Sequence, residues 1–482
     1  MNWYGLVSDF LLGLEHWIIA YVAAINFFQL MMMVLGCAVL RHYHKRLGRV
    51  ERDALWKSAL LPPVSILAPA YNEAATVRQS TRAMLKLRYP NHEVIVINDG
   101  SKDDTLALLT EEFRLYKSSR VPSGNLPTKP VRAVYESREP IRLIVIDKEN
   151  GGKADSLNAG INFARAPIVA AVDSDSLIEE DALLAGVKPF LEEPDLTVAA
   201  GGMVRAVNGC DVRHGRVTEI TAPHSYLALC QALEYLRAFL GARVAMSFVN
   251  GLLIISGAFG LFRRDAVIAA SGFAVDTVGE DMELVVRLHE MWQEKKVVYR
   301  ILFVPEPVCW TELPETWKVL QRQRNRWQRG CFESLWHHRK LWLNPRYGAV
   351  GMFAVPYFVM FEMLAPLVET LGYITTTLGL ALGIILPQIA FGFFLVSVVF
   401  GILLSMSALA LEELTIRRYS TVADFTRLCA TAILENVGYR QALTLWRTKG
   451  LIDGIRGKQG WGKMERRGFG RQPEQPPQSR AA

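Results

Sequence analysis

Two long apolar segments constrain the fold of this chain more than any other feature of its sequence. In residues 16–40 only the first residue can carry charge, and about 24 residues at helical rise span roughly 36 Å, enough to cross a bilayer. In residues 347–411 the only ionisable side chains besides tyrosines are Glu362 and Glu369, and a glycine and a proline within 383–387 offer a break between two spans. The sequence therefore predicts a membrane protein with about three crossings.

The distribution of basic residues predicts the orientation of these crossings. Residues 1–15 contain no Lys or Arg, whereas the far side of the first segment is rich in them: Arg41, Lys45, Arg46, Arg49, Arg52 and Lys57. Basic loops stay in the cytoplasm, so we expect an inner (plasma) membrane protein with its amino terminus outside. A cleavable signal peptide is the competing interpretation of the first segment, but the positive amino-terminal region that it needs is missing.

Charge and cysteine content argue against three other classes of protein. The formal net charge is +7, yet much of the excess lies beside the apolar segments, where topology explains it, so we expect no nucleic-acid partner. The six cysteines form no CxxC pair, which argues against a zinc site and against a small disulfide-rich fold.

Between the apolar segments, short apolar runs alternate with longer amphipathic ones. We expect strands at 64–70, 93–99, 141–147 and 167–173, and a helix within 73–87. Such alternation favours a mostly parallel sheet with helices on both faces. A Pro-, Ser- and Arg-bearing stretch, 116–140, is interpreted as an inserted loop.

Acidic residues collect where these strands end. Asp173 and Asp175 lie two apart, so on an extended backbone their side chains share a face. Two carboxylates so close repel each other unless a cation intervenes, and oxygen ligands suit Mg²⁺ or Mn²⁺. Because ligands of open α/β sheets bind at the carboxyl ends of strands, the hypothesis is a metal holding a diphosphate. The alternative is a solvated turn in which Asp175 caps the next helix.

Two further positions point to a nucleotide. Asp99, in "INDGSKDDT", ends the second strand and would accept hydrogen bonds from a base; turn chemistry explains Asp-Gly equally well. Lys153, in "NGGKADSLNAG", follows glycines that let the backbone approach a ligand, and it suits a phosphate or a uracil carbonyl. Its alternative is an exposed loop entering a helix.

The motifs "APAYNEA", "INDGSKDDT", "GGKADSLNAG" and "VDSDS", in this order, resemble the nucleotide-binding half of family 2 glycosyltransferases with a GT-A fold. "SGAFGLFRR", "VGEDMELVVRL" and "QRNRW" further along resemble the acceptor floor, the catalytic-base segment and the QxxRW signature of processive polysaccharide synthases, such as those of poly-N-acetylglucosamine, hyaluronan, chitin and cellulose. The fold class that this resemblance implies is α/β: a cytoplasmic, Rossmann-like GT-A sheet with about three transmembrane helices.

The resemblance also implies site residues. Asp281 matches the catalytic base, with Glu280 beside it; the alternative is an amphipathic helix that opens with acids, which the helix dipole favours. Tyr71 and Glu73 match residues of the nucleotide pocket.

Three residues of "QRNRW" complete the predicted catalytic set: Gln323, Arg326 and Trp327. Arg326 would spread charge developing on the leaving diphosphate, and Trp327 would stack on the acceptor sugar. The alternative is a basic helix lying on anionic lipid, and we expect Arg322 and Arg329 to make that contact.

The expected function is inverting transfer of a sugar from a UDP-sugar, with UDP-N-acetylglucosamine or a related hexose as donor, to a growing β-linked extracellular polysaccharide, with Mg²⁺ or Mn²⁺. Non-processive transfer to a membrane lipid is the alternative, and a catalytically silent scaffold is the rival from another class. Glu362 and Glu369, seven apart on one helical face, would line a polymer channel or instead lie at the headgroups. With so few crossings, a complete pore would need an accessory subunit or self-association.

The resemblance and the apolar segments together predict four parts. We expect a transmembrane helix with a basic linker (1–61), a GT-A glycosyltransferase domain (62–340), transmembrane helices (341–413), and a basic cytoplasmic tail (414–482) containing an interfacial helix over 425–447 and a disordered end.

Overall fold

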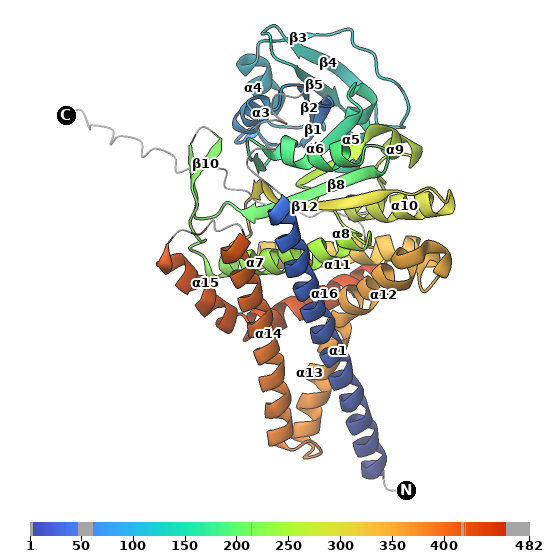
Figure 1. Ribbon diagram of the computed structural model, residues 1–482, viewed down its shortest axis with the longest axis vertical. Helices are drawn as coiled ribbons and strands as arrows, with labels where there is room; N and C mark the ends of the chain where they lie inside the picture. Colours follow the sequence, from blue (N-terminus) through green and yellow to red (C-terminus); the bar gives the residue numbers. More distant parts are fainter. Residues whose placement is uncertain (1–2, 47–60, 214, 416–418, 420, 459–482) are drawn as a thin grey trace, which may run out of the picture.

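The computed structural model describes residues 3–46, 61–213, 215–415, 419 and 421–458. A twisted sheet with flanking helices, here called the sheet domain, lies at one end of the molecule, and three long helices extend away from it (Figure 1). A layer of helices lies across the junction between these two parts (Figure 1). The predicted basic linker, from residue 47 onward, and the predicted disordered end lie outside the described residues.

Ten strands form the main sheet in the order β3-β4-β5-β2-β1-β6-β11-β8-β12-β7. Their bounds are β1 Val64–Ala70, β2 His92–Asn98, β3 Leu115–Lys117, β4 Val131–Ser137, β5 Leu143–Lys148, β6 Ile168–Val172, β7 Leu177–Ile178, β8 Thr197–Ala206, β11 Phe259–Arg263 and β12 Arg300–Thr311. A separate two-stranded hairpin comprises β9 Asp211–Arg213 and β10 Arg216–Glu219.

The four predicted strands form the parallel centre of this sheet, β5-β2-β1-β6. Their apolar, β-branched runs are buried along nearly their whole length, as expected for strands covered on both faces. Because they run in parallel, the polar residues that follow β1, β2 and β6 meet at one edge.

The sheet is mostly parallel, as predicted, but it is mixed, because β4, β7 and β11 run opposite to the other strands. β4 pairs antiparallel with β5 and β3, and β11 pairs antiparallel with both β6 and β8. β4 lies inside the stretch 116–140 that was interpreted as a loop, and its residues are mostly half-exposed rather than alternating, so no strand periodicity marks it.

The helices of the sheet domain are α3 Val77–Leu85, α4 Thr105–Glu112, α5 Lys153–Phe163, α6 Ala182–Glu192, α9 Arg264–Ala269 and α10 Glu280–Glu294. The predicted helix within 73–87 is thus confirmed in a shorter form. Asn72 has a positive φ of 55°, so the chain turns before α3 can begin.

Three helices of the described chain are long and apolar enough to cross a membrane: Gly5–Tyr43, Val350–Ala381 and Pro387–Thr415. The first belongs to α1 (Trp3–Arg46), and the other two contain α13 (Ala365–Ala381) and α14 (Pro387–Thr415). α1, α13 and α14 run side by side, and α1 begins at the end far from the sheet (Figure 1). The predicted break near 383–387 is confirmed.

α1 is longer than the predicted span because its second half packs on the sheet domain. At about 1.5 Å per residue, 44 residues extend roughly 66 Å, well beyond the apolar core of a bilayer. Met32, Met33 and Leu40 are buried in the main hydrophobic core together with residues of the sheet. This half of α1 therefore anchors the sheet domain to the membrane segments.

The layer across the junction contains α7 Tyr226–Leu236, the π-helical turn η1 Arg237–Arg243, α8 Val244–Phe248, α11 Trp317–His337, α12 Val355–Tyr357, α15 Val422–Leu434 and α16 Tyr439–Ile455. The single interfacial helix predicted over 425–447 is instead two helices, α15 and α16. Gly438, with a positive φ of 85°, turns the chain between them. α16 packs against α11 and α13, so it is part of the folded core of the junction.

Candidate active site

A cavity of about 1840 Å³ opens at the carboxyl ends of β1, β2 and β6 and continues between the apolar helices. Every predicted site residue lines it: Tyr71, Glu73, Asp99, Lys153, Asp173, Asp175, Glu280, Asp281, Gln323, Arg326 and Trp327. These residues come from the loops that follow β1, β2 and β6 and from three helices, α5, α10 and α11, that are far apart in sequence. The fold brings the predicted set together, while the chemical role of each residue remains a prediction.

Asp173 and Asp175 lie in a turn rather than on an extended strand. β6 ends at Val172, and the amide of Ser176 donates to the carbonyl of Asp173 (3.0 Å), which closes the turn. The physical reason predicted for their proximity was therefore wrong, but both carboxylates still line the cavity.

Lys153 lies at the centre of the acidic wall, as the first residue of α5. Its Nζ is 2.5 Å from Oδ1 of Asp173 and 3.5 Å from Oε1 of Glu280, and it donates to the carbonyl of Gly257 (3.1 Å). Burial alone would lower the pKa of Lys153, but the surrounding carboxylates outweigh burial and raise it. Lys153 is thus a fixed cation that joins the acids after β6 to those that open α10.

Asp281 stands at the amino terminus of α10 with its carboxylate held by two backbone amides. Oδ2 accepts from Gly257 (3.0 Å) and Oδ1 accepts from Met282 (2.8 Å). A Cβ on Gly257 would lie 2.9 Å from Nζ of Lys153 and 3.1 Å from Oδ2 of Asp281, so only glycine lets this loop pass so close.

Glu280, beside Asp281, is buried. Burial is the main cause that raises its pKa, and the charge of Asp281 acts in the same direction, while Lys153 opposes both. Glu280 is therefore drawn toward the protonated form.

Asp99 is buried, and both of its carboxylate oxygens are held by the glycine-rich loop. Oδ1 accepts from Nζ of Lys148 (2.7 Å) and from the amide of Gly151 (2.9 Å), and Oδ2 accepts from the side chain of Asn150 (3.1 Å) and the amide of Gly152 (2.8 Å). These bonds hold the loop that leads into Lys153. Hydrogen bonding of Asp99 to a base remains a prediction.

Lys148, the last residue of β5, is a partner of Asp99 that sequence analysis missed. It is fully buried and also forms an ion pair with Asp155 (2.5 Å). A lysine at the end of an apolar strand gives no signal of its own, because only the neighbouring strand brings Asp99 to it.

The helix α11 presents Gln323, Arg326 and Trp327 to the cavity, and Trp327 is 40% exposed there. The guanidinium of Arg324 lies 4.6 Å from the Trp327 ring centroid and is 2.5 Å from Oε2 of Glu234 on α7. This pair, which the sequence did not indicate, sets the orientation of Trp327.

The lipid contact predicted for Arg329 is wrong, whereas Arg322 is exposed. Arg329 is buried, and its Nη1 donates to the carbonyl of Lys458 (2.8 Å). The end of α16 covers this face of α11, and a helical wheel of α11 alone cannot show that cover.

Two family descriptions match the part of the chain that builds this cavity. Residues 65–124 match glycosyl transferase family 2, and residues 129–330 match glycosyltransferase like family 2. The chain belongs to glycosyltransferase family 2. Both matches lie inside the sheet domain and the start of the junction layer, where the predicted motifs occur.

Relatives of this family 2 glycosyltransferase include polymer synthases. It is 28% identical over 303 residues to the poly-beta-1,6-N-acetyl-D-glucosamine synthase of Staphylococcus epidermidis, covering 63% of this chain and 61% of the relative. It is 28% identical over 276 residues to the synthase of the same name from Staphylococcus aureus (strain COL), covering 57% and 56%. The chain therefore spans about three fifths of the length of these relatives.

The fold is shared with a mannosyltransferase from Pyrobaculum calidifontis, solved in complex with GDP-Man and Mn2+. The two structures superpose with a TM-score of 0.52 at 17% identity, over 92% of this chain and 100% of that one. The glycosyltransferase thus has a GT-A fold, as the motifs predicted.

The carboxylate oxygens of Asp173 and Asp175 in the glycosyltransferase fit a hard divalent cation whose remaining ligands come from a substrate. Within the described residues, no third carboxylate, histidine or cysteine joins Asp173 and Asp175 in a ready-made metal cluster. Mg²⁺ is usually held by one or two carboxylates together with substrate phosphates and water, so two aspartates facing a cavity suffice. Asp173 keeps 31% of its side chain exposed for such a ligand.

The far end of the cavity lies among the apolar helices, where Glu362 and Glu369 line it. Arg447 of α16 donates from Nη2 to Oε2 of Glu362 (3.0 Å), and Thr444 donates to Oε2 of Glu369 (2.7 Å). Both acids therefore face a polar interior formed with α16. Sequence analysis missed Arg447, because α16 was taken as a surface helix.

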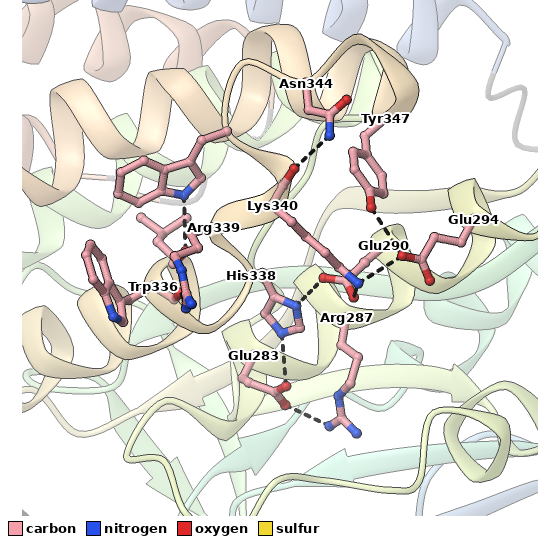
Figure 2. Close-up of polar contacts among 12 residues, drawn as sticks. Glu283, Arg287, Glu290, Glu294, Trp336, His338, Arg339, Lys340, Asn344 and Tyr347 are labelled. Carbon is pink, nitrogen blue, oxygen red and sulfur yellow. Dashed lines mark hydrogen bonds and ion pairs between the residues drawn. The ribbon is translucent and has the colours of Figure 1, made fainter.

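A second cluster of charges joins the helix that carries Asp281 to the helix that carries Gln323. His338, directly after α11, lies between two carboxylates of α10: Nδ1 is 2.6 Å from Glu290 and Nε2 is 3.1 Å from Glu283 (Figure 2). Arg287 pairs with Glu283 (2.7 Å) and Lys340 pairs with Glu290 (2.6 Å), as Figure 2 also shows. The two helices are thus tied together behind the site.

The protonation of His338 follows from these partners. Burial alone would lower its pKa, but the hydrogen bonds to Glu283 and Glu290 outweigh burial and raise the pKa above its usual 6.5. The same bonds lower the pKa of both glutamates, although burial opposes this.

We expect His338→Gln to lower the free energy of unfolding by about 3 kcal/mol near pH 6, because two buried carboxylates lose their shared cation. The contribution of His338 is fully present below pH 6.5 and is lost as the pH rises through its raised pKa. Glu283 and Glu290 depend on pH in the opposite direction. Their contribution to stability is present above their usual pKa of 4.5 and is lost as the pH falls through their lowered pKa values.

Melting temperatures measured from pH 5 to 9 in detergent would check this prediction, with His337→Gln as the matched control, because His337 is the exposed neighbour. The wild type and the control should lose stability above pH 6.5, and His338→Gln should lose much less over the same range. If the melting temperatures of all three proteins change with pH in the same way, charged His338 does not stabilise the pair of carboxylates.

Proposed function

We propose that this chain is an inverting, membrane-embedded glycosyltransferase that adds sugars from a UDP-sugar to a growing β-linked extracellular polysaccharide. The observation that carries the proposal is the continuity of the cavity. It is lined by the predicted donor residues at one end, by Asp281 in the middle, and by Glu362 and Glu369 among the apolar helices at the other end. A chain of sugars leaving the site would need such a path. The polymer synthases among its relatives support the same reading.

The reaction needs a base, and Asp281 is placed to act as one. In the proposed step its carboxylate takes the proton from an acceptor hydroxyl as that oxygen forms a bond to the donor's anomeric carbon. The bond from that carbon to the diphosphate breaks, and UDP leaves with the electron pair. The amides of Gly257 and Met282 keep the carboxylate oriented during the transfer.

The diphosphate end of the donor would lie near Asp173, Asp175 and Lys153. These aspartates would hold Mg²⁺ or Mn²⁺, which supplies electrostatic stabilisation of the departing diphosphate when it is bound. Lys153 and Arg326 add fixed positive charge on the same wall of the cavity. Tyr71 and Glu73 would contact the nucleoside, and Trp327 would stack on the acceptor sugar.

The three apolar helices support a proposed arrangement in the membrane. α1 begins at the end far from the sheet domain, and α14 leads back to that domain (Figure 1). With basic residues on the sheet side, the sheet domain would lie in the cytoplasm of a cell with an inner membrane, and the amino terminus would lie outside. An accessory subunit or a second copy would complete the pore.

Membrane vesicles that contain the protein, incubated with single UDP-sugars and either Mg²⁺ or Mn²⁺, would test the function. We expect UDP release with one donor, UDP-N-acetylglucosamine first, together with products of many sugar units. A single sugar attached to lipid would instead establish the non-processive alternative. Vesicles without the protein are the control, and no UDP release above that control with any donor would refute both readings.

A further inference from the structure

Arg243 is a half-buried cation of the cavity wall that belongs to none of the recognised motifs. It is the last residue of the π-helical turn η1, it lines the cavity, and it is close enough to Asp281 and Glu362 for both carboxylates to act on its charge. Its position is therefore between the predicted base and the apolar helices, along the path that an acceptor would take.

The guanidinium of Arg243 has an unmet hydrogen-bonding capacity. Its Nη1 is buried and, among the described residues, has no hydrogen-bond partner. The guanidinium lies over the ring of Phe239, whose centroid is 4.1 Å from Cζ of Arg243. Other cations of the same wall are paired with a carboxylate: Lys153 with Asp173, Arg237 with Glu435, Arg324 with Glu234 and Arg447 with Glu362.

A second polar atom on the same wall is also left without a partner. Oε1 of Gln323 is buried and has no hydrogen-bond partner within the described residues. Buried polar groups are nearly always satisfied, so an unsatisfied donor and an unsatisfied acceptor lining one cavity point to a ligand that supplies both. A sugar hydroxyl does so, because it donates one hydrogen bond and accepts others.

The backbone holds Arg243 in place through a tight crossing of two helices. A Cβ on Gly36 of α1 would lie 2.8 Å from the carbonyl oxygen of Gly241, so α1 and η1 approach backbone to backbone. π-helical turns occur frequently at functional sites, since the extra residue re-aims the side chains that follow. This crossing fixes the end of η1 against the membrane anchor of the protein.

We propose that Arg243 binds an oxygen of the acceptor saccharide and positions its hydroxyl for Asp281. This inference rests on the proposed function, because it assumes that a saccharide enters the cavity. The ligand would be a sugar unit that offers hydroxyl or acetamido oxygens, which accept hydrogen bonds from a guanidinium.

The electrostatics of the ligand-free protein agree with this role. Burial lowers the pKa of Arg243 to about 10, although Asp281 and Glu362 act against that shift. Because the buried Nη1 has no acceptor among the described residues, it contributes no hydrogen bond to the stability of the protein without a ligand. A residue that binds the acceptor can therefore be told from one that only supports the fold. If Arg243 binds the acceptor, removal of its charge should leave the melting temperature of the ligand-free protein unchanged or higher.

The test compares Arg243→Met and Arg243→Lys with the wild type and with Arg300→Met, a surface control at the start of β12. The probes are UDP-N-acetylglucosamine and a β-1,6-linked N-acetylglucosamine pentamer. We expect Arg243→Met to raise the acceptor KM about 10–100-fold, the usual cost of a hydrogen bond to a charged group, with the donor KM and acceptor-free UDP release unchanged. Arg243→Lys should lie between the two.

Thermal unfolding gives the second readout. Arg243→Met should melt at or above the wild-type temperature, and the stabilisation that the pentamer gives to the wild type should be lost. A wild-type acceptor KM in Arg243→Met, or a marked loss of its stability without ligand, would overturn the inference. If the wild type transfers no sugar from any donor, the proposed function is refuted. The inference about Arg243 is then decided by melting alone: it stands if the pentamer stabilises the wild type but not Arg243→Met, and it fails if the pentamer stabilises both or neither.

Discussion

Asp281→Asn is expected to reduce turnover by about 100- to 10,000-fold, the usual contribution of a general base. The amide has the size of the carboxylate, and its oxygen can still accept from the amide of Gly257, so the start of α10 should keep its geometry. What it cannot do is take a proton from the acceptor hydroxyl. Donor binding, measured by calorimetry, should therefore stay at the wild-type level while UDP release and polymer formation fall.

Asp276→Asn is the matched control for this variant. Asp276 lies a few residues upstream in the same loop, is exposed, and is not part of the cavity lining. It should keep wild-type rates. Product formation at the wild-type rate in Asp281→Asn would remove Asp281 as the base.

Removal of the divalent cation is expected to have an effect of similar size. A metal contributes several kcal/mol of charge stabilisation at a departing diphosphate, which corresponds to at least about a 100-fold loss of rate in chelator. Replacement of both Asp173 and Asp175 by alanine should do the same, and added Mg²⁺ or Mn²⁺ should restore the chelated wild type but not the double variant. UDP release across a metal titration is the measurement.

A double variant of two exposed acids, Asp195→Ala with Asp276→Ala, controls for the loss of negative charge. It should respond to metal as the wild type does. If the wild type stays fully active in chelator, or the Asp173 and Asp175 double variant stays active, the proposed metal has no part in the reaction.

The motifs located the nucleotide half of the site well because their residues follow strands. Each of the strands β1, β2 and β6 is an apolar run that ends in a polar turn, and parallel strands must place those ends along one edge. Asp99, Asp173 and Asp175 could therefore be predicted as neighbours without any knowledge of tertiary contacts. The apolar helices could be predicted as well, since a bilayer requires about 20 consecutive apolar residues.

The second layer of the site could not be predicted in this way. Lys148, Arg324, His338 and Arg447 are ordinary basic residues in the sequence, and each gains its place only from a carboxylate that is distant in the chain. Arg243 is the opposite case, because the fold buries its Nη1 without giving that atom a partner among the described residues.

The sequence by itself determined which helices are long and apolar enough to cross a membrane, which strands form the centre of the sheet and which acids lie at its edge, because these depend on local composition and on the periodicity of strands and helices. Only the tertiary structure decided that β4 and β11 make the sheet mixed, that the end of the chain folds as α15 and α16 within the junction, and that one cavity joins Asp173 to Glu369. The physical reason is that these features come from the packing of segments far apart in sequence, which no local pattern encodes.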